Sequence, residues 1–416
     1  MIDSNLKETN TSTLTRQIYR GERGVTSWWN TAAVCDLPGA YGPADLLGLI
    51  GLLPAIRRMG FSAILLRLSL PDLNPQRDYI AKLVKATHAA QLKILVRVRS
   101  DAATVSPQDS PPPVELDNDP DTLIERTRVL MGAGVDGVDL GLIDDDPARP
   151  HREDRIRQFT ETVNRQLAEV ASLDSTVILT AEASVAHPEF FEHHVQEDWF
   201  HHLRDDSLLQ APWDASELRK RVAKAYSSRA PLGQTVAWRP AFNPAAEGAD
   251  ARTPNPGSWA DGAPIGRVNA FLTFVSSLPG ALYLPFVSAG GQVEVEEGSR
   301  PQLRLSLAND PQSRYQHDLT TRILTLRERK HLSHSNLALI DDISWAHPGV
   351  SVHLSGHIMV VLNASSEPVA VPAKHLPLLY SDGFVFSDAT HTVIQPDTCA
   401  WFEPAPANPH NPLAYR

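Results

Sequence analysis

The chain has 416 residues, of which 42% are hydrophobic and 21% charged, and its formal net charge is −11. This composition excludes a disordered chain and predicts one barrel-sized domain together with a smaller one. The acidic balance argues against nucleic acid or an anionic membrane as a partner, because both require clustered Lys and Arg. A neutral ligand such as a sugar is compatible with it.

Cysteine usage and the N-terminal segment indicate the compartment. Cys35 and Cys399 lie near opposite ends of the sequence, which gives no disulfide framework and is typical of a reducing compartment. Cys35 is expected in the core of the first strand. Residues 1–24 lack the apolar stretch of a signal peptide, and no apolar run reaches the ~18 residues of a membrane span. We therefore expect a cytoplasmic protein with a flexible N-terminus over residues 1–24.

The middle of the chain alternates short apolar runs with helical patterns. Because the alternation continues over about 300 residues, it predicts a parallel sheet, and eight such units would close into a barrel. The alternative is an open doubly wound sheet, but no Gly-rich phosphate fingerprint follows the first strand. Strands are predicted at 61–70, 92–98, 135–142, 177–181, 235–238 and 281–286, and helices at 78–90, 120–132, 156–170, 215–226, 266–277 and 316–330.

The pattern changes after the last of these helices. Short β-rich segments at 350–354, 358–362, 369–371 and 392–395 are separated by turn residues. We therefore predict an α/β fold, with a (β/α)8 TIM barrel over residues 25–332 and a small C-terminal antiparallel β-sandwich over residues 333–416. The Pro-rich, acidic segment 100–119 has no periodic pattern and is expected to be a surface loop.

Several motifs resemble one known family. Residues 134–141 (GVDGVDLG) resemble the fourth barrel strand of the α-amylase superfamily, glycoside hydrolase family 13, which usually reads G-V-D-G-F-R-x-D. Its bacterial α-glucosidases are the most similar members. The motifs follow the family's order over roughly residues 25–400. The other matching stretches are Trp28-Trp29, 44–60, 77–94, 177–182 (VILTAE), 278–281 (LPGA) and 360–363 (VVLN).

The resemblance implies a retaining glycosidase that has lost most of its catalytic set. The family's nucleophile stands at the position of Gly141, and its conserved Arg at that of Asp139. On the third strand, Arg97 replaces an Asp and Ala102 a His, and no His-Asp pair ends the seventh strand. Segment 100–119 stands where the family inserts its domain B. Only Glu182, at the general acid/base position, remains.

One carboxylate does not make a retaining glycosidase, because the mechanism requires two carboxyl groups ~5 Å apart. Glu182 could hydrogen-bond a ligand or be an inherited residue without a role. Asp139 should lie ~6.6 Å deeper in the barrel than Gly141, given ~3.3 Å of rise per residue. Asp144 follows the strand in an acidic loop, for which a solvated surface is favoured over a relocated nucleophile.

Arg97 and Asp139 together suggest a charge exchange. The third and fourth strands are neighbours, and a buried carboxylate must be paired or it destabilises the fold. We therefore predict an ion pair between Arg97 and Asp139 inside the barrel mouth.

Residues 192–202 (EHHVQEDWFHH) are dense in side chains that can ligate zinc. Adjacent residues point in different directions, however, and no HExxH pattern is present. A surface histidine cluster is favoured, and we expect no metal and no cofactor.

Three functions stay open. The joint losses favour an inactive family 13-like pseudoenzyme of carbohydrate metabolism, which binds sugar, acts as a scaffold or forms an oligomer with an active glucosidase. In lacking domain B and a full catalytic set, it is similar to the heavy chain of animal amino-acid transporters. The alternative is a divergent retaining α-glucosidase or transglycosylase that uses Glu182 as acid/base and Asp144 as nucleophile. The third is a lectin-like module in which Trp238 contacts an oligosaccharide.

Overall fold

The computed structural model describes the chain from Leu14 to Pro404, with several gaps. The described residues are 14–21, 26–39, 41–68, 73–98, 120–143, 152–174, 176–183, 188–240, 259, 263–296, 302–307, 310–373, 375–382, 386–388 and 390–404. The predicted surface loop 100–119 and Asp144 lie outside these ranges.

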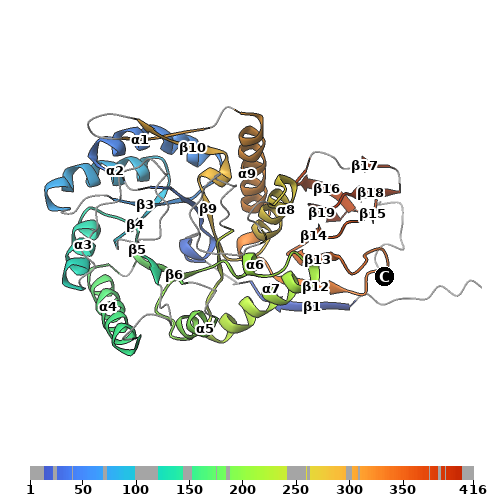
Figure 1. The fold of residues 1–416 in the computed structure, drawn as a ribbon, viewed down its shortest axis with the longest axis horizontal. Helices are drawn as coiled ribbons and strands as arrows, with labels where there is room; N and C mark the ends of the chain where they lie inside the picture. Colours follow the sequence, from blue (N-terminus) through green and yellow to red (C-terminus); the bar gives the residue numbers. More distant parts are fainter. Residues whose placement is uncertain are drawn as a thin grey trace, which may run out of the picture.

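Eight parallel strands close into a barrel, as the strand–helix alternation predicted (Figure 1). Each strand pairs with the next along the chain, and the last pairs back with the first, so no edge is left open. The bottom of the barrel is filled by small and branched side chains such as Ala63, Leu65 and Ile178. The strands are β2 (Ala33–Asp36), β3 (Ala63–Arg67), β4 (Lys93–Arg97), β5 (Gly137–Ile143), β6 (Ile178–Ala183), β7 (His202–Asp205), β8 (Ala237–Trp238) and β9 (Ala281–Pro285).

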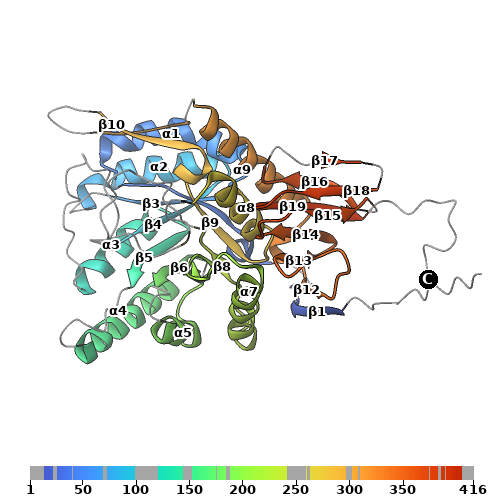
Figure 2. The same cartoon turned by 45° about the vertical axis from the view of Figure 1, so that its right-hand side comes forward.

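Helices surround the barrel, and several begin where the sequence provides a cap (Figure 2). The Asp214 side chain accepts hydrogen bonds from the backbone of Ser216 and Glu217, and Asp310 accepts one from Ser313. The helices are α1 (Pro43–Arg58), α2 (Arg77–Ala89), α3 (Pro120–Gly132), α4 (Arg152–Leu173), α5 (Pro188–Gln196), α6 (Ser207–Gln210), α7 (Ala215–Arg229), α8 (Ile265–Ser276) and α9 (Pro311–Arg329), with 3-10 turns η1 (Trp28–Thr31), η2 (Asn74–Gln76), η3 (Ala230–Leu232), η4 (Val287–Ala289) and η5 (Leu332–His334).

Two antiparallel sheets form the C-terminal domain. The larger has the strand order β1-β12-β13-β14-β19-β16 and the smaller β15-β18-β17, and an apolar core that includes Val352, Val361, Val371 and Phe402 joins them. A separate hairpin, β10 (Gly291–Glu296) and β11 (Gln302–Leu307), contacts α1. The remaining strands are β12 (Leu337–Asp341), β13 (Val350–Ser355), β14 (Ile358–Asn363), β15 (Val369–Pro372), β16 (His375–Tyr380), β17 (Phe386–Ser387), β18 (His391–Ile394) and β19 (Thr398–Pro404).

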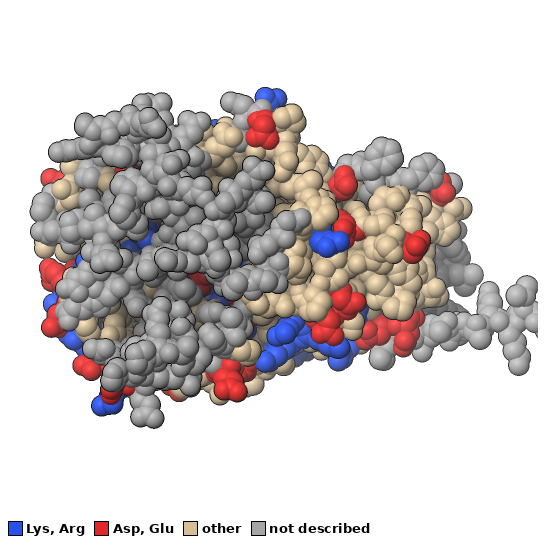
Figure 3. All heavy atoms as spheres, viewed as in Figure 1, with Lys and Arg blue, Asp and Glu red and all other residues tan. Residues whose placement is uncertain are grey.

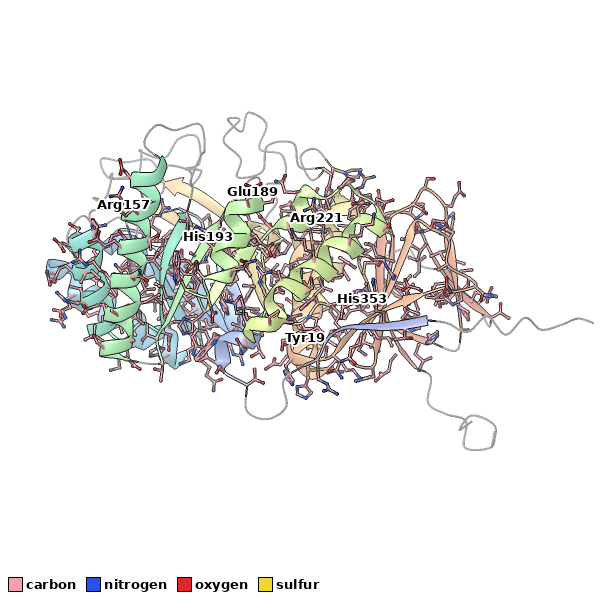
Figure 4. All side chains as sticks on the ribbon, turned by 90° about the horizontal axis from the view of Figure 1, so that it is seen from below. Tyr19, Arg157, Glu189, His193, Arg221 and His353 are labelled. Atoms are coloured by element: carbon pink, nitrogen blue, oxygen red, sulfur yellow. The ribbon has the colours of Figure 1, made fainter. Side chains whose placement is uncertain are left out.

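Part of the N-terminal segment is a strand, so the expectation of a flexible stretch over residues 1–24 was wrong for these residues. β1 (Leu14–Tyr19) pairs antiparallel with β12 at the edge of the larger sheet. Figure 4 shows it beneath α7, and the ring of Tyr19 lies 4.9 Å from that of Tyr226. The segment is too polar to predict a strand by itself, because its partner lies more than 300 residues away in the sequence.

Polar contacts fasten the barrel to the C-terminal sheets. Asp397 accepts hydrogen bonds from Trp213 Nε1 at 2.6 Å and from Arg267 Nη2 at 3.0 Å, and Arg219 of α7 donates to the carbonyls of Ile340 and Val352. Figure 3 shows basic and acidic side chains intermingled on this part of the surface. No helix in the described part of the chain is long and apolar enough to span a membrane.

Candidate functional site

Polar side chains line the upper interior of the barrel, at the carboxyl ends of the strands. Inward-facing residues alternate along a strand, so Arg97 follows Leu95, Thr180 follows Ile178, and Arg239 follows Ala237 on the inner face. In TIM-barrel enzymes this end carries the active site. The polar residues that share the inner face include Asp36, Arg67, Arg97, Asp139, Thr180, Glu182, His202, Arg204, Arg239 and Tyr283.

Asp139 is the centre of this network and is completely buried. The predicted ion pair is present: Arg97 Nε donates to Asp139 Oδ1 at 2.9 Å, and the two residues are direct partners across β4 and β5. The sequence did not predict its other partners. Arg204 Nη1 donates to Oδ2, and the Thr180 hydroxyl donates to the same oxygen at 2.5 Å.

The electrostatics of the site hold Asp139 in its charged form. Burial by itself would raise the pKa of the carboxyl, but Arg204, Arg97 and the Thr180 hydroxyl hold that pKa well below its usual range. Burial likewise opposes the charge on Arg204, yet Asp139 keeps the pKa of the guanidinium above its usual value. Arg204 also lies over the ring of Tyr283, with 5.3 Å between Cζ and the ring centroid. The network is a buried ion cluster in which both oxygens of Asp139 accept hydrogen bonds.

Gly141, at the position of the lost nucleophile, lies in an irregularity of β5. The pairing with β6 steps from Asp139–Thr180 to Leu142–Glu182, so β5 contains one extra residue. Gly141 has φ +69°, in the left-handed region that favours glycine, and its N–H donates to Asp139 Oδ1 at 2.8 Å. The position of the family's nucleophile therefore lacks a carboxylate, and its backbone also departs from that of a regular strand.

Glu182, at the acid/base position, is also held by arginines. Arg239 Nη1 donates to its Oε1, and Arg204 Nη2 lies 3.6 Å from its Oε2. Arg204 therefore lies between the carboxylates of Glu182 and Asp139 and interacts with both. Glu182 is therefore paired with two guanidinium groups.

The expectation of a surface histidine cluster at 192–202 was wrong for His194 and His202, whereas His193 and His201 are exposed. The segment contains the end of α5 and the first residue of β7, and His194 and His202 are buried. His202 Nδ1 hydrogen-bonds to Tyr283 Oη at 2.7 Å, and its Nε2 to the Trp29 carbonyl at 2.9 Å. The described residues contain no group of three metal-ligating side chains. Alternation around Arg204 would have identified β7, but a strand of four residues, three of them polar, gives little signal.

Trp238 does not face the barrel mouth, so its prediction as a sugar contact was wrong. Its neighbour Ala237 faces inward, which turns the indole outward against Tyr226 of α7. The side chain is 1% exposed, and Nε1 donates to the Pro279 carbonyl at 3.2 Å.

The architecture has solved relatives. An α-amylase from H. orenii has a TM-score of 0.59 at 12% identity, covering 90% of this chain and 99% of that one. An α-amylase from Geobacillus thermoleovorans, complexed with acarbose, has a TM-score of 0.58 at 15% identity, covering 91% of this chain and 99% of that one. A debranching enzyme from Nostoc punctiforme has a TM-score of 0.54 at 12% identity, with coverages of 90% and 98%. This chain has the α-amylase fold. No family model and no curated protein sequence matches it.

The contacts of Asp139 and Glu182 limit the catalysis that this α-amylase-like barrel could perform. A retaining glycosidase needs one carboxylate free to attack the sugar and one acid able to donate a proton. The oxygens of Asp139 accept hydrogen bonds from Arg97, Arg204, Thr180 and the Gly141 N–H. Glu182 accepts one from Arg239, and its other oxygen lies 3.6 Å from Arg204 Nη2. Neither Asp139 nor Glu182 is therefore available for either task.

Proposed function

We propose that this chain is a catalytically inactive relative of the α-amylase-fold glycosidases. The observation that carries the proposal is the guanidinium of Arg204, which interacts with both Asp139 and Glu182. A general acid must hold a proton near neutral pH, which enzymes achieve by apolar surroundings or a neighbouring negative charge. Glu182 has the opposite environment, two positive neighbours.

Within that proposal, the chain acts in carbohydrate metabolism, in the cytoplasm, as a scaffold or partner subunit of an active glucosidase. Both structural domains of the fold are retained although the catalytic set is lost, which supports a role in which surfaces rather than the mouth are used. The burial of Trp238 removes the residue on which the lectin-like alternative depended. Co-purification from the native host tests this role: a stoichiometric active glucosidase is expected, and purely monomeric protein would oppose it.

Activity assays test the loss of catalysis. With aryl α-glucosides and maltooligosaccharides, we expect turnover no higher than that of Glu182→Gln. The alternative, a relocated nucleophile, predicts hydrolysis that is abolished in both Glu182→Gln and Asp144→Asn. Such hydrolysis would overturn the proposal of an inactive barrel.

Restoring the family's carboxylate provides a further prediction. Gly141→Asp is expected to give no α-glucosidase activity and to lower the free energy of unfolding by about 1–2 kcal/mol, because a side chain with a Cβ must adopt φ +69°. The added carboxylate would also face the buried Asp139, whose oxygen accepts the Gly141 N–H. Denaturant unfolding and the same glucoside assay measure both effects.

Gly141→Asn is the matched control, since Asn must adopt the same φ and has nearly the size of Asp but carries no charge. We expect it to destabilise the protein less than Gly141→Asp. Equal stability of Gly141→Asp and the parent chain would show that the bulge accepts a nucleophile, contrary to our interpretation.

A further inference from the structure

A cleft lies at the N-terminal end of the barrel, opposite the mouth. Its volume is about 540 Å³, which is in the range of small-molecule sites. The starts of β2 and β4 contribute Ala33 and Lys93, and the C-terminal ends of α1 and α9 contribute Arg57 and Arg327. The two helices meet here: a Cβ on Gly60 would lie 2.7 Å from Leu324 Cβ. The other lining residues are Thr26, Trp28, Thr31, Ser62, Gln91, Glu328, His331, Ser333 and His334.

Arg327 is a buried cation without a carboxylate partner in the described part of the chain. It is 3% exposed, and its Nη atoms donate to the backbone carbonyls of Ser276, Leu278 and Gly280, at 2.5–2.6 Å. Among the residues that the structure describes, its Nε has no hydrogen-bond partner. Burial lowers the pKa of Arg327 to about 10, as expected for a charge without a counter-ion. A buried, uncompensated guanidinium is costly unless an anion reaches it.

Arg57 provides a second uncommitted guanidinium. Its Nη1 donates to the Phe61 carbonyl at 3.1 Å, and no carboxylate of the described ranges bonds to it. Lys93, by contrast, is already bound to Asp136 at 2.6 Å. Glu328 is the one carboxylate among the lining residues described, and it is exposed. The cleft therefore carries excess positive charge on two helices that converge on it.

The other lining residues indicate which chemical groups the ligand carries. Thr31, Ser62, Gln91 and Ser333 present hydroxyl and amide groups, and Trp28 presents a flat indole. His331, which follows the C-cap of α9, has φ +54°, the left-handed conformation in which many helices end. Guanidinium groups bind phosphate oxygens in a bidentate geometry. We propose that this cleft binds a small, hydroxyl-bearing phosphate ester, with Arg327 and Arg57 contacting its phosphate group.

This proposal is independent of the barrel mouth and of its catalytic state. Isothermal titration calorimetry at constant ionic strength, with glucose 6-phosphate, inorganic phosphate and glucose as probes, tests it. We expect binding of glucose 6-phosphate, weaker binding of inorganic phosphate and no heat with glucose. No heat with either phosphate, or equal binding of glucose and glucose 6-phosphate, would overturn the proposal.

Variants locate the site without disturbing Arg327, whose substitution could unfold the chain. Arg57→Gln should weaken glucose 6-phosphate binding about tenfold, the loss of one charge-assisted contact. Glu328→Gln should strengthen binding, because it removes the opposing charge. Arg58→Gln is the matched control: Arg58 is the next residue of α1, is exposed and does not line the cleft. Equal losses in Arg57→Gln and Arg58→Gln would assign the binding to general surface charge and reject the site.

Discussion

Asp139→Asn is expected to destabilise the protein by about 3–5 kcal/mol, the cost of leaving buried charges without their partner. Arg97 and Arg204 would keep their charge in the interior, because the substituted amide supplies no negative charge to either. Arg204 has no exposed side-chain surface and so cannot turn to solvent. Denaturant unfolding, followed by circular dichroism, measures the loss.

Two further variants show whether the loss of stability in Asp139→Asn is specific to the buried ion pairs. Asp154→Asn breaks an ion pair with Arg157 in which both side chains are largely exposed, so its effect should stay below about 1 kcal/mol. Asp139→Leu combined with Arg97→Met and Arg204→Met should recover part of the stability, since apolar replacement of a whole buried ion cluster is often neutral. A loss below 1 kcal/mol for Asp139→Asn would mean that the network does not stabilise the barrel.

The pairing of Arg97 with Asp139 could be predicted because both positions belong to strands with strong apolar patterns. Their neighbours Leu95 and Val138 fix the inner and outer faces, and the two strands are consecutive in the barrel. Arg204, the second partner of Asp139, lies on a strand of four residues with no comparable pattern. Strands with a clear apolar pattern could therefore be predicted from the sequence. The strand of Arg204, which is defined only by its pairing with neighbouring strands, could not.

Trp238 and Gly141 show two other limits. β8 has only two residues, so nothing in the sequence determines which of Ala237 and Trp238 faces inward, and an error of one position exchanges the faces. The bulge at Gly141 depends on the register between β5 and β6, which is a property of two strands. The sequence therefore predicted that Arg97 pairs with Asp139, whereas the direction of Trp238 and the other partners of Asp139 required the structure.

Acid is expected to weaken the fold well before carboxylates titrate. Burial lowers the pKa of His202 and of His353 to about 3 each. Above pH ~6.5 both are neutral whether folded or unfolded, but between pH ~3 and ~6.5 only the unfolded chain binds the protons, so stability falls as pH falls. From pH 7 to pH 5 the loss should be about 2 kcal/mol per histidine, or about 4 kcal/mol together.

Substitutions identify the histidines responsible for this pH dependence. His353, whose Nε2 lies 2.8 Å from the Ser277 hydroxyl, is labelled in Figure 4 on the C-terminal sheet. His353→Gln should roughly halve the fall in unfolding free energy between pH 7 and pH 5, whatever it costs at pH 7. His193→Gln, a change at a side chain that is 49% exposed, should leave the fall unchanged. A parent chain that is equally stable at both pH values would mean that these buried imidazoles accept protons without unfolding.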